Sequence, residues 1–361
     1  MKSSQQISTM RKRLLAWYDR EGRTLPWRIR PEDRADGVVA DPYKIWLSEV
    51  MCQQTTTTAA SAYWHRFLNT WPTVQDLAAA PRDDILTAWA GLGYYARARN
   101  LHKCAGMVCA NYGGVFPKSE VELLKLPGIG PYSAAAIAGI CYGEATNVVD
   151  GNVERVISRV FRVQATLPKA KPEIRSLAGM LAMAGTGSKH PGDYAQAVMD
   201  LGAHVCKPKN PKCEMCPWQG QCVAYEFGDM QDYPKRQAKT ARPVRYGTVF
   251  FVENEGHIWL RQRPDKGLLG GMMELPGTDW TDEKPDIDVW LGQAPTQSNW
   301  QCVTGEVKHV FTHFTLYLTV FTTQIKPDVI IENGIIYADL DALDEYALPS
   351  LMRKAIALAR S

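Results

Sequence analysis

Apolar positions recur with a helical period along the first two thirds of the chain. Residues 11–19, the segment that follows Asp41-Pro42, and the alanine-rich stretch from Ser133 to Ile140 are predicted helices. Aspartate followed by proline is typical of an N-cap and a first helical position. Helical patterning continues to about residue 205, and residues 29–40, which are charged and contain glycine, are expected to form a loop.

Beyond residue 225 the pattern changes to runs of β-branched and aromatic residues. Residues 248–252, 257–260 and 315–321 are predicted strands, and a last helix is expected over residues 351–359. The stretch 232–245 is rich in proline, lysine and arginine, which is typical of a linker. We therefore predict a helical domain over residues 1–228, a basic linker over 229–245 and a smaller α+β domain over 246–361.

Composition and charge narrow the class of protein. The chain has 361 residues, of which 45% are hydrophobic, which suits two domains with sizeable cores. The net charge is only +3, but basic residues gather in residues 1–30, 207–212 and 235–245, a distribution typical of a nucleic-acid surface as well as of solvated faces. No apolar run approaches the ~20 residues that a membrane span needs, and the polar N-terminus has no signal-peptide core. We expect a cytoplasmic protein without a membrane partner.

Four of the nine cysteines form a tight cluster in the sequence. Cys206, Cys213, Cys216 and Cys222 have the spacing C-x6-C-x2-C-x5-C, which suits zinc or a [4Fe–4S] cluster. Zinc sites usually have two C-x2-C pairs and this segment has one, so the spacing favours iron–sulfur. The other five cysteines have no ligand spacing and are expected in the core.

A glycine-rich turn and an aspartate lie between the predicted helices. The turn runs Leu126-Pro-Gly-Ile-Gly-Pro-Tyr132, and Gly128 and Gly130 allow a tight turn that presents N–H groups at a helix start. Such a turn can grip a phosphate without reading sequence, although it can also be a simple connection. Asp150 follows twenty residues after Gly130 and would, taken alone, be read as a helix N-cap.

Together these motifs resemble the helix-hairpin-helix DNA glycosylase superfamily. The cysteine spacing is similar to the branch that contains endonuclease III and the adenine DNA glycosylases of MutY type. Endonuclease III has a lysine, which forms a Schiff base, where this chain has Tyr132. The segment Trp46-Leu-Ser-Glu-Val-Met-Cys-Gln-Gln-Thr55 looks like the W-x-S-E-V-M-x-Q-Q-T of the adenine family, and Gly91-Leu-Gly-Tyr-Tyr95 and Ala195-Gln-Ala197 also match that family.

Cleavage of the bond between adenine and its sugar needs an acid for the base and a carboxylate for the sugar cation. Glu49 lies among apolar residues, so its pKa should be raised and a proton kept available for adenine N7. Asp150, at a helix start, should stay ionised and stabilise the cation. The resemblance implies these same roles.

The resemblance also implies roles for residues around the two carboxylates. Tyr132 assists near the sugar, Asn152 orients the site, and Gln196 hydrogen-bonds the flipped adenine; for Asn152 and Gln196, helix capping or surface polarity stays an alternative. Gln54 and Tyr94 would intercalate near the partner base, although such residues are more often surface and core.

The C-terminal part resembles the MutT-like (Nudix-fold) recognition domain of adenine glycosylases. The region Gly267 to Gly277 keeps glycines of the fold but has no R-E-x2-E-E, which predicts a binding module and not a pyrophosphatase. The family reads 8-oxoguanine with an F-S-H motif, and the matching residues here are Phe311, Thr312 and His313. Thr312 keeps the hydroxyl and adds a methyl group. A purely structural role for His313 stays an alternative.

The sequence therefore predicts a helix-hairpin-helix glycosylase domain with a [4Fe–4S] cluster, joined to a Nudix-like α+β domain. The expected activity is hydrolysis of adenine from double-stranded DNA, opposite 8-oxoguanine or guanine, by a monomer without a lyase step. One alternative is a pyrimidine glycosylase with lyase activity, against which Tyr132 argues. Another is a non-catalytic DNA-binding or redox-sensing protein, against which the two carboxylates argue.

Overall fold

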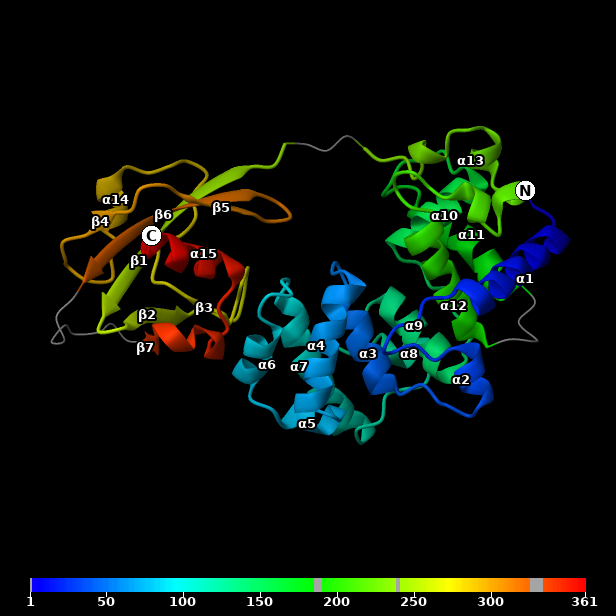
Figure 1. Cartoon of the computed structure of the whole chain (residues 1–361), viewed down its shortest axis with the longest axis horizontal. Helices are drawn as coiled ribbons and strands as arrows, with labels where there is room; N and C mark the ends of the chain where they lie inside the picture. Colours follow the sequence, from blue (N-terminus) through cyan, green and yellow to red (C-terminus); the bar gives the residue numbers. More distant parts are fainter. Residues whose placement is uncertain (1, 185–189, 238–240, 325–333) are drawn as a thin grey trace. The chain divides into compact units, whose positions relative to one another are not determined.

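The computed structural model describes residues 2–184, 190–237, 241–324 and 334–361. Helices dominate the chain up to residue 226 (Figure 1). In the described parts, no helix is both long enough and apolar enough to cross a membrane. The longer helices are α1 (Ser4–Glu21), α3 (Pro42–Met51), α4 (Thr57–Thr70), α6 (Arg82–Trp89), α7 (Ala96–Tyr112), α9 (Pro131–Tyr142), α10 (Gly151–Phe161), α11 (Lys171–Met183) and α12 (Pro191–Asp200).

Shorter elements join these helices. They are α2 (Pro31–Ala35), α5 (Val74–Ala79), α8 (Glu120–Leu123), a π-helical turn η1 (Leu201–Val205), the 3-10 turns η2 (Cys213–Met215), η3 (Gln219–Gln221) and η4 (Met230–Asp232), and α13 (Val223–Glu226).

The chain divides into two compact units. One consists of residues 1–78 and 103–238, and the other of residues 79–102 and 239–361. Within the second unit, the Arg99 guanidinium donates to the carbonyl of Gly270 at 2.5 Å, and Arg82 pairs with Asp265 at 2.6 Å. The boundaries predicted at residues 228 and 245 stay a prediction, and residues 238–240 of the expected linker lie outside the described residues.

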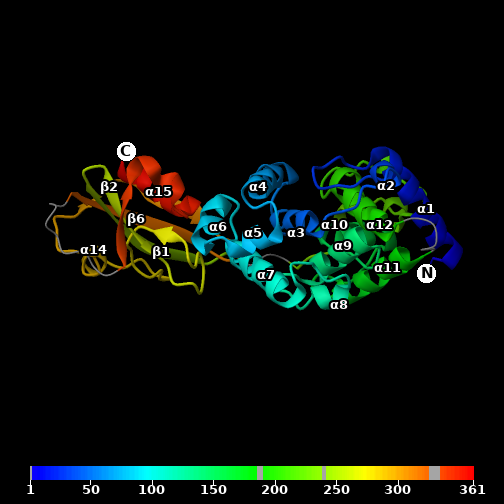
Figure 2. The same ribbon diagram turned by 90° about the horizontal axis from the view of Figure 1, so that it is seen from below.

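Helix α9 forms the centre of the first unit. All eight residues from Ser133 to Ile140 are buried, which confirms the alanine-rich stretch as a closely packed helix. Helices α3, α8 and α12 all pack against α9 (Figures 1 and 2). Helix α9 itself carries Tyr132, and this packing brings two further helices with predicted site residues onto it, α3 with Glu49 and α12 with Gln196.

Two expectations for the N-terminal region need correction. The first helix begins at Ser4 and not at Arg11, because a capping box between Ser3 and Gln6 starts it early. Residues 29–40 are not wholly a loop, since α2 occupies Pro31–Ala35. Pro31 stands at its first turn, and the Asp33 carboxylate accepts the Arg30 backbone N–H at 2.9 Å. Charge and glycine content predict a loop here, whereas the local caps determine where both helices begin.

The second unit contains one mixed sheet, and its described strands follow the order β3-β2-β1-β6-β4, with β5 on β6 and β7 on β2. Strands β1 and β6 run parallel, and the other pairs are antiparallel. The three predicted strands are confirmed as β1, β2 and β6. The strands are β1 (Val244–Asn254), β2 (His257–Gln262), β3 (Met273–Glu274), β4 (Gln301–Cys302), β5 (Val307–Val310), β6 (Thr315–Gln324) and β7 (Ile335–Asp339).

Helices cover both faces of this sheet. Val249 and Phe251 of β1 face a core completed by α15 (Ser350–Ala359), while Phe250 faces a smaller cluster with Trp290 of α14 (Ile287–Leu291). Burial on both faces explains why β1 reads as a continuous apolar run. A 3-10 segment, η5 (Leu340–Glu345), precedes α15. The core position expected for the five other cysteines is confirmed for Cys104 alone. Cys52, Cys109 and Cys141 are partly exposed, and Cys302 on β4 is exposed.

Candidate active site

Glu49 lies in the buried interior of the first unit. It belongs to α3, where every residue from Ile45 to Met51 is buried, and the glutamate itself is 9% exposed. Burial raises the pKa of the Glu49 carboxyl, and the Asp150 charge raises it further. A hydrogen bond with Tyr132 and the positive charge of Arg28 act in the opposite direction. The net effect raises the pKa of Glu49, as the apolar setting predicted.

Tyr132 is the side chain that contacts Glu49. It stands at the second position of α9, and its hydroxyl also lies 3.1 Å from the Met199 sulfur of α12. Burial and the neighbouring carboxylates raise the pKa of Tyr132 well above its ordinary value, so the phenol keeps its proton. A neutral phenol beside Glu49 donates a hydrogen bond and offers no amine for a covalent adduct with the sugar.

Asp150 is both an N-cap and a member of the carboxylate pair. Its Oδ1 accepts the Val153 backbone N–H at 2.7 Å, and its Oδ2 accepts the Asn152 side-chain amide at 2.9 Å. Burial raises the pKa of Asp150, while these N–H donors lower it. We expected the helix terminus to keep Asp150 ionised, but burial acts against this. The hydrogen bonds from Val153 and Asn152 are the interactions that favour the ionised form.

Asn152 links Asp150 to the cysteine segment. The Arg155 guanidinium donates to Asn152 Oδ1 at 3.0 Å and to the Cys206 carbonyl oxygen at 2.7 Å. At Gly202 the backbone approaches Asn152 so closely that a Cβ atom would lie 2.6 Å from the Asn152 Cβ. Asn152 therefore has a defined position between Asp150 and η1, and the N-cap of α10 is Asp150 and not Asn152.

Gln196 presents a buried amide without a partner in the described structure. The residue is 1% exposed, and neither its Oε1 nor its Nε2 has a hydrogen-bond partner there. An unsatisfied buried amide is destabilising unless a ligand completes its hydrogen bonds. Gln196 lies one helical turn from Met199, which Tyr132 contacts. The amide thus has the donor and acceptor that base recognition requires.

The glycine-rich turn connects α8 to α9. Gly128 has a φ of 76°, in the left-handed region that favours glycine, and Gly130 is the N-cap of α9. Gly130 provides no side chain to cap the first turn. The helix start therefore has backbone N–H groups of the kind that bind phosphate oxygens. The two glycines are in the geometry expected of a helix-hairpin-helix turn.

The two intercalation candidates are exposed residues with a strained backbone. Gln54, which follows α3, has a φ of 57°, and Tyr94, which precedes α7, has a φ of 48° and is 48% exposed. Positive φ values are uncommon for residues other than glycine and often mark functional positions. The expectation from sequence alone, that the tyrosine pair lies in the core, holds for Tyr95, which is 6% exposed, and not for Tyr94.

Residues 311–314 form the tip of the hairpin between β5 and β6 in the second unit. The Phe311 backbone N–H donates to the Phe314 carbonyl oxygen at 2.9 Å, which closes the turn around Thr312 and His313. Both of these residues are exposed, whereas Phe314 is buried. Within this unit, the Tyr94 hydroxyl lies 3.0 Å from the Thr312 hydroxyl. The turn thus presents the His313 imidazole to solvent and places the Thr312 hydroxyl beside the Tyr94 hydroxyl.

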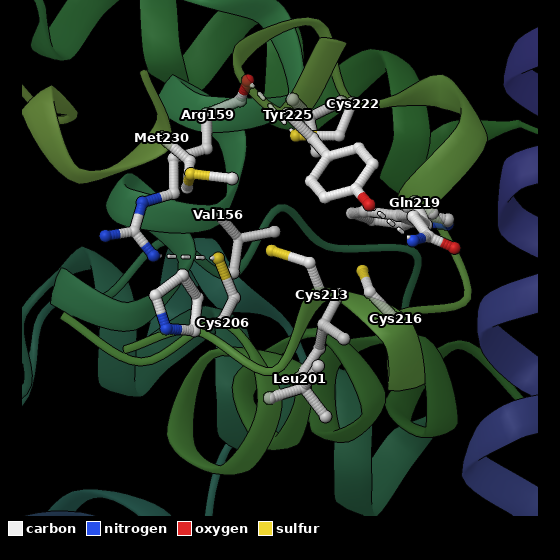
Figure 3. Close-up of a pocket in the computed structure, with 14 residues that line it drawn as sticks. Val156, Arg159, Leu201, Cys206, Cys213, Cys216, Gln219, Cys222, Tyr225 and Met230 are labelled. Atoms are coloured by element: carbon white, nitrogen blue, oxygen red, sulfur yellow. Dashed lines mark hydrogen bonds between the residues drawn. The ribbon is translucent and has the colours of Figure 1, made fainter. Parts of the chain in front are cut away.

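The four clustered cysteines line one cavity of the first unit (Figure 3). Their sulfur atoms come from the end of η1 and from the turns η2 and η3, and point into the same space. The Arg159 guanidinium lies 3.3 Å from the Cys206 sulfur and donates to the carbonyl oxygens of Lys207 and Pro208. Four thiols with a nearby cation are a donor set that fits an iron–sulfur cluster with thiolate ligands.

Comparison with known proteins identifies this arrangement. Residues 47–180 match the HhH-GPD superfamily of base excision DNA repair proteins, residues 206–222 match the iron-sulfur binding domain of endonuclease III, and residues 248–358 match the NUDIX domain. The adenine DNA glycosylase of Homo sapiens is 32% identical, over 97% of this chain and 73% of the relative. That of Mus musculus is 34% identical, over 88% and 70%. The chain belongs to the adenine DNA glycosylase family.

Solved structures share the helical fold of this adenine DNA glycosylase family member. A thermostable thymine-DNA glycosylase is 28% identical, with a TM-score of 0.53, over 61% of this chain and 97% of that protein. An endonuclease III–DNA complex is 22% identical, with a TM-score of 0.51, over 63% and 99%, and shows the fold alone. The predicted fold class, enzyme class and [4Fe–4S] cofactor are confirmed.

The sequence reasoning missed one charged group of the glycosylase core. Asp200, one turn beyond Gln196, has a side chain that is 0% exposed and accepts both guanidinium nitrogens of Arg28, at 2.9 and 3.0 Å. Arg23 adds a third contact at 2.6 Å. Although burial alone would raise it, these arginines lower the pKa of Asp200 overall. The sequence signal that could have identified Asp200 is its position four residues after Gln196, on the same face of a largely apolar helix.

Proposed function

We propose that this DNA glycosylase hydrolyses adenine from double-stranded DNA where adenine is mispaired with 8-oxoguanine or guanine, and that it does so as a monomer in the cytoplasm. The observation that carries the proposal is the buried Glu49 carboxyl in contact with Tyr132 and within the field of Asp150. A buried acid beside an ionised carboxylate is the pair that base protonation and sugar-cation stabilisation need.

Each site residue has a role in the proposed mechanism. Glu49 gives its proton to N7 of the extruded adenine, and the electron pair of the glycosidic bond moves to the departing base. Asp150 stabilises the resulting positive charge on the sugar, held in place by Val153 and Asn152. Water then attacks the anomeric carbon, and the Glu49 carboxylate takes up its proton.

Recognition of adenine is assigned to Gln196. Its unpartnered amide can donate to and accept from the edge of a flipped base. Extrusion leaves a gap in the stack, and the exposed Gln54 and Tyr94 are suited to fill it beside the partner base. Thr312 and His313, presented at their hairpin tip, are suited to reading the 8-oxoguanine edge.

The four cysteines are the proposed ligands of the [4Fe–4S] cluster. These thiols would hold the cluster, and the segments that carry Cys206 and Cys222 would thereby be tied together. Arg159, which holds the Lys207 and Pro208 carbonyls, would then keep the basic stretch 207–212 in one conformation. A fixed basic loop together with the Gly128–Gly130 turn is suited to grip the DNA backbone without reading its sequence.

The absence of a lyase step rests on Tyr132. The phenol occupies the place beside Glu49 where a Schiff-base lysine would be needed, and burial keeps it protonated. Borohydride should therefore trap no covalent adduct between the protein and its DNA. Efficient trapping, or cleavage at thymine glycol with adenine left in place, would instead support a pyrimidine glycosylase with lyase activity.

The substrate assignment is tested by comparing partner bases. Duplexes with adenine opposite 8-oxoguanine, guanine or thymine are incubated with excess enzyme, and abasic sites are counted after heating in alkali. We expect cleavage opposite 8-oxoguanine and guanine, and none opposite thymine. Equal cleavage opposite all three bases would contradict reading of the partner base, and no cleavage would contradict the activity itself.

The pKa directions predict a bell-shaped pH dependence. Glu49 must be protonated and its pKa is raised, so the single-turnover rate should fall as the pH rises through that value. Asp150 must be ionised, so the rate should also fall as the pH drops through the pKa of Asp150. Because that pKa is raised, this acidic fall should begin at a higher pH than an ordinary aspartate would cause. Single-turnover rates measured across the pH range test this. A rate that climbs steadily through neutral pH would contradict Glu49 as the acid.

A further inference from the structure

One tryptophan of the same unit, Trp280, packs against both ends of the Phe311–Phe314 turn. The Trp280 ring stacks on Phe311, with centroids 5.7 Å apart and an interplanar angle of 28°. The same ring contacts Phe314, with centroids 5.9 Å apart. Phe311 and Phe314 are the two residues that close the turn, so one indole supports both of its ends.

Trp280 is itself held in place from three sides. The backbone of Thr281 exchanges two hydrogen bonds with Tyr246, at 2.8 and 2.9 Å, which ties the segment to β1. Gly247 leaves the space for the indole, because a Cβ atom there would lie 2.6 Å from Trp280 Cδ1. The Arg263 guanidinium covers the ring, 5.4 Å from its centroid.

Trp280 differs from an ordinary core residue because it packs behind an exposed turn. Trp280 is only partly buried, and the turn that it backs exposes Thr312 and His313. The other contacts of the turn are His309 beside Phe311, Arg245 over Phe314 and the Tyr94 hydroxyl beside Thr312. Trp280 differs from these three in contacting both Phe311 and Phe314, so it is placed to set the direction of the tip from its base. Loss of the indole would leave the strands β5 and β6 paired but would allow the tip to tilt.

We propose that Trp280 is a positioning residue for partner-base reading: it fixes the direction in which the turn presents Thr312 and His313. The inference rests on the proposed function, in which these two side chains contact 8-oxoguanine. The inference thus assigns an effect on specificity to Trp280, a residue that lies outside the predicted motif. Trp280 is not expected to affect the chemistry at Glu49 and Asp150.

The test compares Trp280→Ala, Trp280→Phe and a control, Trp300→Ala. Trp300 is also a partly buried aromatic residue of this unit, but it packs against Phe250 in the separate cluster with Trp290. For each variant we would measure single-turnover adenine excision opposite 8-oxoguanine and opposite guanine, and take the ratio of the two rates. Thermal unfolding identifies any variant that does not fold.

Trp280→Ala is expected to lower the ratio about 3- to 10-fold, a change that corresponds to one or two lost aromatic contacts. Trp280→Phe should retain most of the preference, and Trp300→Ala should leave the ratio at the wild-type value. If Trp280→Ala does not fold, Gly247→Ala takes its place, because the added methyl group displaces the indole. An unchanged ratio in a folded variant, or an equal fall in Trp300→Ala, would overturn the proposal.

Two further variants separate this inference from the function on which it rests. Thr312→Val and His313→Ala remove the reading groups themselves and should also lower the ratio. If they lower it and Trp280→Ala does not, only the positioning role is wrong. If none of these variants changes the ratio while adenine is still removed, reading of 8-oxoguanine by this turn is wrong.

Discussion

Glu49→Gln is expected to lower the single-turnover rate of adenine excision by about 10²- to 10⁴-fold, the range for loss of a general acid. The amide has the shape of the acid and fits the same buried site among Trp46, Leu47 and Val50, but it has no proton to give to adenine N7. Because the glutamine is neutral, its burial costs no charge desolvation, and the fold should be kept. Rapid-quench measurement of abasic-site formation is the assay.

A matched control for this variant is Glu154→Gln. Glu154 lies in the first turn of α10, close in sequence to Asp150, but its carboxylate pairs with Lys171 at 3.4 Å. It should retain the wild-type rate. If Glu49→Gln were as active as the wild type, the acid would have to be another group, and the assignment of the buried carboxyl would fail.

Asp150→Asn is the second variant with a large expected effect, and it removes the charge while it keeps the N-cap of α10. Asparagine is as good an N-cap as aspartate, so the hydrogen bond from the Val153 N–H can be kept and α10 should start at the same residue. The negative charge beside the sugar disappears, together with one hydrogen bond, because the single amide oxygen cannot replace both carboxylate oxygens that accept from Val153 and Asn152. We expect a fall of about 10²- to 10³-fold in the excision rate, the size seen when one electrostatic stabiliser is removed.

Asp41→Asn is the control for this second variant. Asp41 caps α3 in the same manner, by accepting the Tyr43 N–H at 2.9 Å, but it is not assigned to the chemistry. Binding of the mispaired duplex should be retained by both variants, as a gel-shift titration would show. A rate loss in Asp41→Asn as large as that in Asp150→Asn would mean that helix capping, and not charge, is what the reaction needs.

Much of the fold could be predicted because its signals are local. The alanine-rich stretch at 133–140, the Asp41-Pro42 helix start and the β-branched runs each encode one element, and α9, α3 and the strands β1, β2 and β6 are where they were expected. The shortest elements could not be predicted, because caps or partner strands determine where they form. The helix α2 depends on a carboxylate two positions beyond its first proline, and β3 and β4 are two-residue strands that depend on their partners.

The features of the site likewise divide into those that the local sequence predicts and those that depend on tertiary packing. The apolar sequence around Glu49 predicted its raised pKa, because the neighbours along a buried helix create the environment. For Asp150 the sequence suggested only a helix terminus, and the burial that raises its pKa comes from tertiary packing. Asp200 and Trp280 were missed because their partners, Arg28 and Phe311, are distant in sequence and no motif joins them.

The most direct test of the central claim is to identify the base that the wild-type protein releases. A duplex with adenine opposite 8-oxoguanine is incubated with a preparation that shows the visible iron–sulfur band and about four irons per chain, and the products are separated by chromatography. The account predicts free adenine in an amount equal to the abasic sites formed, with no adduct after borohydride treatment. Intact adenine in the duplex, with the cluster present and the protein folded, would contradict it.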